Sequence, residues 1–220
     1  MPPNIQTDVE TGRPESLGAI VLCGGESRRM GRAKPWLDWG PQTLLQHAVA
    51  VLRQATPEVV VVAAPGQKLP ELPAEVQRLD DSVRNEGPLC GMQIGLEALA
   101  KSCSHAFVMG CDSPFITPAF IDEIARRVGS YEIVVPKDDQ FFHPLAAIYQ
   151  TSLSPRVLEL IQKGKRKPRF LLDQSKTLAL DPRQLQSYDP SGLTLQNLNT
   201  PDDYTAALKR YQQNQEESSS

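Results

Sequence analysis

The chain has 220 residues, of which 40% are apolar and 22% are charged, and its formal net charge is −3. These values are typical of one folded domain with a hydrophobic core, and they exclude a disordered chain and a strongly basic nucleic-acid-binding protein. Because no apolar run reaches the roughly 18 residues of a membrane span and no signal peptide opens the sequence, we expect a cytoplasmic protein without membrane or nucleic-acid partners.

Both ends of the sequence are polar and have little to bury. We therefore predict a flexible N-terminal tail over residues 1–16 and a disordered C-terminal tail over residues 212–220. One domain occupies residues 17–211 between them. The four cysteines lack the spacing of a zinc site or a disulfide framework, so free thiols are expected at Cys23, Cys90, Cys103 and Cys111.

Short β-rich apolar runs alternate with helix-length amphipathic stretches along this domain. The runs predict strands at 18–23, 59–63, 106–110 and 133–135, and a weaker one at 177–179. Such alternation is typical of a three-layer α/β/α domain with a Rossmann-like, mostly parallel sheet. Right-handed crossovers would then bring the loops after the strands together at the carboxyl edge of the sheet, where ligands bind in this architecture.

Helix signals stand between the predicted strands. Residues 44–54 carry apolar side chains at helical spacing behind Thr43, a plausible N-cap. A second helix is expected from Pro88 or Leu89 to Lys101, and a third after Thr117-Pro118. Weaker patterns predict helices at 154–163, 169–174 and 201–211.

The loop after the first predicted strand is rich in glycine and cations. It begins at Leu22-Cys23-Gly24-Gly25 and continues through Arg28, Arg29 and Gly31 to Lys34. Glycines let a backbone approach a ligand closely, and the three cations can neutralise a triphosphate. A plain strand-to-helix turn with surface cations is the alternative, but the density of cations favours phosphate binding.

A carboxylate follows the strand predicted at 106–110, in Cys111-Asp112-Ser113-Pro114. At the carboxyl end of a strand, Asp112 and the phosphates of a nucleotide would together provide the oxygen ligands that Mg²⁺ prefers. The alternative role of Asp112 is to form a turn before Pro114.

Two further segments remain open between a functional and a structural role. Asp80-Asp81 precedes a loop from Gly87 to Gly91, which either holds a ligand or only permits close helix packing. Lys163, Lys165, Arg166, Lys167 and Arg169 form a basic cluster, which is either a solvated face or a phosphate site. His143 is expected at a strand edge rather than as a general base.

Five motifs in one order make the resemblance specific. The chain resembles the molybdenum cofactor guanylyltransferase family, whose members carry LAGGxSxRMGxxK, a DS…GPLAG loop, CDxP, HPLxAxY and NxNTPxD. The matching segments here are 22–34, 81–91, 111–114, 143–149 and 197–203. The resemblance implies a fold of the nucleotide-diphospho-sugar transferase type and an Mg²⁺-dependent transfer of GMP from GTP to the phosphate of molybdopterin.

The resemblance also implies roles for individual residues. The residues implied to bind the nucleotide are Leu22, Cys23, Gly24, Gly25, Lys34, Asp81 and Asp112. Lys34, Arg29 and Asp112 would act in catalysis, with Mg²⁺ on Asp112. The pterin side would include Gly91, Arg166, Asn197 and Asn199. A molybdenum-cofactor carrier or a recipient oxidoreductase is an implied further partner.

Two features bear on the choice of nucleotide. Members of this family read LxGG in the first loop and their cytidylyltransferase relatives read LxAG, so Gly24 favours the larger purine. Family members often have an asparagine at the end of the second strand, where this chain has Val62-Ala63-Ala64. A molybdopterin cytidylyltransferase, a sugar- or polyol-phosphate nucleotidyltransferase and a cofactor-binding chaperone without activity are the alternatives.

Overall fold

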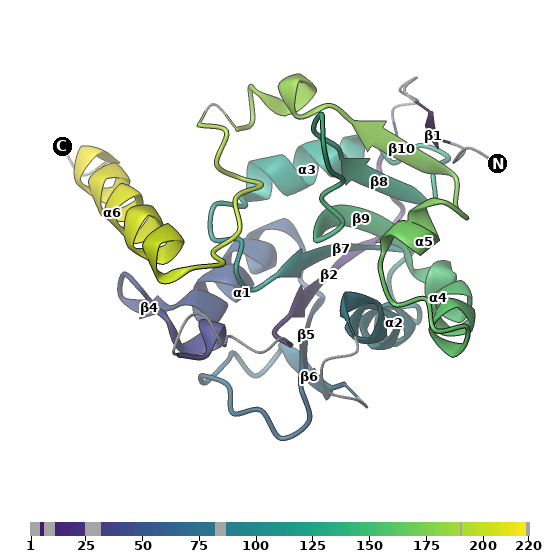
Figure 1. The fold of residues 1–220 in the computed structure, drawn as a ribbon, viewed down its shortest axis with the longest axis horizontal. Helices are drawn as coiled ribbons and strands as arrows, with labels where there is room; N and C mark the ends of the chain where they lie inside the picture. The colour runs from purple at the N-terminus through teal and green to yellow at the C-terminus, as the bar shows by residue number, and fades with distance from the viewer. Residues whose placement is uncertain (1–4, 7–11, 25–31, 82–86, 190, 219–220) are drawn as a thin grey trace.

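The computed structural model describes residues 5–6, 12–24, 32–81, 87–189 and 191–218. Their main element is an eight-stranded sheet in the order β1-β10-β8-β9-β7-β2-β5-β6, with helices on both faces (Figure 1). The predicted three-layer α/β/α architecture with a mostly parallel sheet is confirmed. In the part of the chain that the structure describes, no helix is both long and apolar enough to cross a bilayer.

Four neighbouring parallel strands form the half of the sheet that carries the predicted motifs. They are β7 (His105–Gly110), β2 (Leu17–Leu22), β5 (Val59–Ala63) and β6 (Gln77–Asp80). Leu22 is in register with Val62 on one side and with Gly110 on the other. Because the strands are parallel and in register, the loops that follow them leave from the same edge.

The other half of the sheet contains the one strand that runs against its neighbours. β9 (Ala146–Gln150) lies between β7 and β8 (Ile133–Pro136) and is antiparallel to both, while β10 (Thr177–Leu180) is parallel to β8. The sequence patterns predict neither β9 nor β6. β6 lies at the edge of the sheet, where three of its four residues are exposed. Its sequence is therefore polar and lacks the apolar run by which the other strands are predicted.

Each face of the sheet is covered by helices whose apolar sides form a separate core. One core joins α1 (Leu44–Ala55) and α3 (Pro118–Arg126) to the sheet, and the other joins α2 (Pro88–Leu99), α4 (Ser154–Gln162) and α5 (Arg169–Leu172). Thr43 caps α1 as predicted, since its hydroxyl accepts the Gln46 amide at 3.3 Å. All of the predicted helices are present.

The remaining elements are short, apart from the last helix. They are the 3₁₀ turns η1 (Lys34–Trp36), η2 (Thr151–Leu153) and η3 (Pro182–Leu185), and the hairpin of β3 (Asp38–Trp39) and β4 (Gln42–Thr43). α6 (Pro201–Ser218) packs on this hairpin through a third cluster, in which the Trp39 and Tyr211 rings lie 5.0 Å apart. α6 extends to Ser218, over most of the segment for which we predict a disordered tail. Residues 212–216 are exposed, and they include glutamine and glutamate, which favour helix formation without burial.

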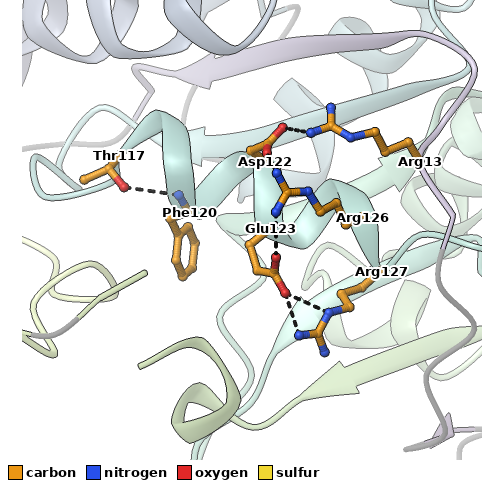
Figure 2. Close-up of polar contacts among 7 residues, drawn as sticks. All are labelled: Arg13, Thr117, Phe120, Asp122, Glu123, Arg126 and Arg127. Carbon is orange, nitrogen blue, oxygen red and sulfur yellow. Dashed lines mark hydrogen bonds and ion pairs between the residues drawn. The ribbon is translucent and has the colours of Figure 1, made fainter. Parts of the chain in front are cut away.

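The described parts of the N-terminal segment, residues 5–6 and 12–16, contact the rest of the domain. β1 (Ile5–Gln6) adds a parallel edge strand beside β10. Further along, Gly12 donates its amide to Arg126 O at 2.9 Å, and Arg13 pairs with Asp122 on α3 (Figure 2). Backbone pairing with a sheet edge does not depend on apolar side chains, so the polar composition of residues 1–16 gave no sign of it.

Glu123 anchors the polar side of α3 from a nearly buried position. Its carboxylate, 6% exposed, accepts hydrogen bonds from Arg127 at 2.8 and 2.5 Å and contacts Arg126 at 3.5 Å (Figure 2).

Glu123→Ala should lower the free energy of unfolding by about 2 kcal/mol, because it leaves Arg127 without its partner. Asp122→Ala is the matched control, since Asp122 is 34% exposed and should cost less than about 1 kcal/mol. Urea unfolding measures both variants, and equal losses would contradict an anchoring role for Glu123.

Candidate active site

Backbone hydrogen bonds hold the ends of the four parallel strands together at the carboxyl edge. The Cys23 amide donates to Val62 O at 2.8 Å, and the Cys111 amide donates to Leu22 O at 3.1 Å. On the far side, the Asp81 amide donates to Ala63 O at 2.7 Å. The motifs predicted to bind nucleotide are therefore brought to one edge, although Leu22, Asp81 and Asp112 lie far apart in the sequence.

An ion pair between Lys34 and Asp112 lies at this edge. Lys34 Nζ is 2.6 Å from Asp112 Oδ2, and the two side chains are 19% and 20% exposed. Lys34 reaches it from η1 and Asp112 from the turn after β7. The pair joins the two strongest sequence motifs in one partly buried but accessible position.

Gly110 makes room for the Asp112 carboxylate. A Cβ built on Gly110 would lie 2.4 Å from Asp112 Oδ1, so any other residue would push the carboxylate away. The apolar pattern predicts Gly110 only as the end of a strand. The sequence signal for this role is a glycine two residues before a candidate catalytic carboxylate.

The segment around Asn197 and Asn199 lies against the Asp112 turn. Leu198 donates its amide to the Asp112 carbonyl at 2.9 Å, and Ser113 Oγ donates to Asn197 Oδ1 at 2.7 Å. Both asparagines are exposed while Leu198 between them is buried. The segment that carries the two asparagines predicted on the acceptor side is thus held against the turn that contains Asp112.

Asp203 adds a second negative charge near Lys34. Hydrogen bonds from the Thr200 hydroxyl and from the amides of Asn199 and Thr200 lower the pKa of its carboxyl, and the charge of Lys34 lowers it further. Asp203 therefore stays ionised and fixes the start of α6 beside the site.

The first loop begins with a buried thiol at Cys23 and an exposed glycine at Gly24. A Cβ added to Gly24 would meet no atom of the described residues within 4 Å. The hydrogen bond of Cys23 with Cys111, together with burial, raises the pKa of the Cys23 thiol well above its usual value. A thiol held protonated in this way is a poor nucleophile, which argues against a covalent role for Cys23.

Gly91 and Arg166, both predicted on the pterin side, lie near the start of α2. Gly91 is buried in α2, where a Cβ would approach Leu22 to 3.1 Å and Asp81 Oδ2 to 3.9 Å. Arg166 borders the start of α2, since its carbonyl oxygen would lie 3.0 Å from a Cβ on Gly87. The contacts of Gly91 are with predicted nucleotide-side residues, and they agree with its alternative role in close helix packing.

Several predicted site residues lie outside the described residues. They are Gly25, Arg28, Arg29 and Gly31 of the first loop, and residues 82–86 of the loop before α2. Elsewhere in the described chain, no group of three histidine, cysteine, aspartate or glutamate side chains is placed to hold a metal ion.

Comparison with known proteins adds a family and a set of relatives. A family model described as a MobA-like NTP transferase domain matches residues 19–178. A protein of Mycobacterium avium (strain 104), named "Probable molybdenum cofactor guanylyltransferase", is 40% identical over 195 residues, which cover 86% of this chain and 94% of that protein.

Solved structures give the same fold. The molybdopterin-guanine dinucleotide biosynthesis protein A of Archaeoglobus fulgidus superposes with a TM-score of 0.71 at 22% identity, over 91% of this chain and 99% of that one. The 2-C-methyl-D-erythritol 4-phosphate cytidylyltransferase of Thermus thermophilus gives a TM-score of 0.66 at 16% identity, over 89% and 98% of the two chains.

Proposed function

Because the chain belongs to the family of MobA-like NTP transferase domains and is thus a nucleotidyltransferase of molybdenum cofactor biosynthesis, we propose that it transfers GMP from GTP to molybdopterin. The terminal phosphate of molybdopterin would attack the α-phosphorus of GTP. The bond from that phosphorus to the leaving oxygen breaks, and pyrophosphate is released. The Lys34–Asp112 pair at the carboxyl edge is the observation that supports this most directly.

Charge neutralisation would be the main contribution of the site, because two polyanions must meet. Asp112 would hold Mg²⁺ beside the phosphates of GTP, and this ion would withdraw charge from the phosphate oxygens. Lys34 can exchange its carboxylate partner for a phosphate oxygen, since its side chain is partly exposed. We assign Arg29 and Gly25 to the same phosphates on the family resemblance.

No general base is required in this scheme. A phosphate monoester has a second pKa near about 6, so the attacking oxygen of molybdopterin is largely ionised at neutral pH. The ring nitrogens of two histidines are engaged within the protein, since His47 bonds to Pro114 O at 2.9 Å and His143 pairs with Asp138 at 2.8 Å.

The acceptor would lie on the side of Asn197 and Asn199. The Asn197 carbonyl oxygen is held by Ser113, which leaves its amide N–H groups for a ligand, and the Asn199 side chain is exposed. We assign Arg166 and its basic neighbours to the pterin phosphate on the same resemblance. A carrier protein or a recipient oxidoreductase would then take up the dinucleotide.

The direct test is mass spectrometry of products after incubation with molybdopterin, Mg²⁺ and each of the four nucleoside triphosphates. We expect the guanine dinucleotide and pyrophosphate. A mainly cytosine product would replace the proposal with a cytidylyltransferase, and GTP binding without any product would favour the chaperone alternative.

Gly24→Ala should shift the product of an equal GTP and CTP mixture toward the cytosine form. The added methyl meets no atom within 4 Å in the part of the chain that the structure describes, and Gly24 has no positive φ, so the substitution should not disturb the described fold. A loss of GTP preference would therefore mean that the added methyl occupies space that the purine needs. If the displaced purine loses one hydrogen bond, the preference for GTP should fall about tenfold. An unchanged product ratio would remove Gly24 from base selection.

A further inference from the structure

A tight turn fixes Gln67 next to the first loop. The chain leaves β5 through Ala64-Pro65-Gly66-Gln67, and the Gln67 amide donates to Ala64 O at 2.9 Å. Gly66 has a φ of 67°, in the left-handed region that the third position of a type II turn requires, and proline suits the second position. These residues direct the chain back across the carboxyl edge.

The Gln67 side chain joins the ends of two neighbouring strands. Its Oε1 accepts the Ala64 amide at 2.9 Å, and its Nε2 donates to the Cys23 carbonyl at 3.2 Å. One partner is a donor and the other is an acceptor, so only one orientation of the side-chain amide satisfies both. The backbone at Cys23, which leads directly into Gly24, is thereby tied to the end of β5.

Further contacts hold Gln67 in place. Arg78 donates to the Gln67 carbonyl at 2.8 Å, and Asp80 fixes Arg78 through bonds of 2.9 and 3.1 Å. The next residue is held as well, since Trp36 Nε1 donates to Lys68 O at 2.9 Å. Because these bonds form without a ligand, little conformational entropy remains to be lost when a ligand binds.

We propose that Gln67 is a positioning residue that sets base selectivity by fixing the Cys23–Gly24 backbone. The inference rests on the proposed function, which places the purine against this backbone. Gln67 holds the Cys23 carbonyl in one direction, so the polar backbone groups of the loop meet the base edge in one arrangement. If the Cys23–Gly24 backbone could reorient, it would bind purine and pyrimidine more equally, because its polar groups could then pair with either base.

Gln67→Glu and Gln67→Met test this role. Glutamate can still accept the Ala64 amide but cannot donate to the Cys23 carbonyl when ionised, whereas methionine removes both bonds without adding charge. We expect each variant to lower the ratio of GTP to CTP affinity about tenfold, as the loss of one such hydrogen bond implies. At saturating GTP, kcat should change less than about threefold. The ratio is the diagnostic quantity, since the negative charge of glutamate would weaken the binding of both anionic nucleotides alike.

Gln54→Glu is the matched control. Its side chain also donates to a backbone carbonyl, Ala50 O at 3.3 Å, but from the exposed surface of α1. It should leave the ratio unchanged. Arg78→Met keeps the Gln67 side chain but removes the hydrogen bond to the Gln67 carbonyl. We expect a smaller decrease in the ratio of GTP to CTP affinity. This variant tests the proposal if the Gln67 variants unfold.

Equilibrium titration with fluorescent GTP and CTP analogues distinguishes a failure of the proposed function from a failure of the role proposed for Gln67. If the parent protein binds no nucleotide or prefers CTP, the proposed function fails. If the parent prefers GTP and the folded Gln67 variants keep that preference, only the role of Gln67 is overturned.

Discussion

Replacing Asp112 by asparagine is expected to slow nucleotidyl transfer at least about 10³-fold while the protein remains folded. A neutral amide is a weak ligand for Mg²⁺ beside phosphates, so the variant would lose the metal from the reaction. Little of the effect should be structural. The Asp112 carbonyl still accepts the Leu198 amide, and an asparagine oxygen still accepts a hydrogen bond from Lys34.

Pyrophosphate release under single-turnover conditions measures the effect of Asp112→Asn. Electron paramagnetic resonance of Mn²⁺, used as a substitute for Mg²⁺, should show weaker binding in the presence of GTP. Asp202→Asn is the control, because Asp202 is exposed in the first turn of α6. Turnover within about tenfold of the parent would remove Asp112 from the metal role.

Lys34→Ala is expected to lower kcat/KM for GTP by about 10²- to 10³-fold, which corresponds to about 3–4 kcal/mol. A cation on the triphosphate acts in both the ground state and the transition state, so GTP affinity and kcat should fall together. A second effect follows from the ion pair. Removing the ammonium group from Asp112 leaves a free carboxylate, so the nucleotide-free variant should bind Mn²⁺ more tightly than the parent.

Arg32→Ala is a close control for Lys34→Ala. Arg32 is a neighbouring cation that pairs at 3.1 Å with Asp38, but both side chains are mostly exposed, at 56% and 71%. It should change neither GTP affinity nor Mn²⁺ binding appreciably. If Lys34→Ala binds GTP normally and Mn²⁺ no more tightly, Lys34 serves only as a local partner of Asp112.

Elements with local signals could be predicted from the amino-acid sequence. Burial on both faces makes β2, β5 and β7 continuous apolar runs, and burial on one face gives the capped helix α1 a helical period, so both patterns can be read from neighbouring residues. The motif order is also local information, and it leads to the family that the comparisons support. These motifs identify Lys34 and Asp112 as candidate site residues, but they do not indicate the distance between the two side chains.

Which of these residues meet depends on the tertiary structure. The 2.6 Å contact of Lys34 with Asp112 and the bond of Leu198 to the Asp112 carbonyl join segments that are remote in sequence, and no local pattern encodes such pairs. The edge strands β1 and β6 form through backbone hydrogen bonds, which leave little trace in side-chain polarity. Gln67 escapes sequence-based prediction for the same reason. A glutamine in a polar loop has no distinguishing pattern, and its place at the site depends on a turn that carries its amide to a strand formed more than forty residues earlier.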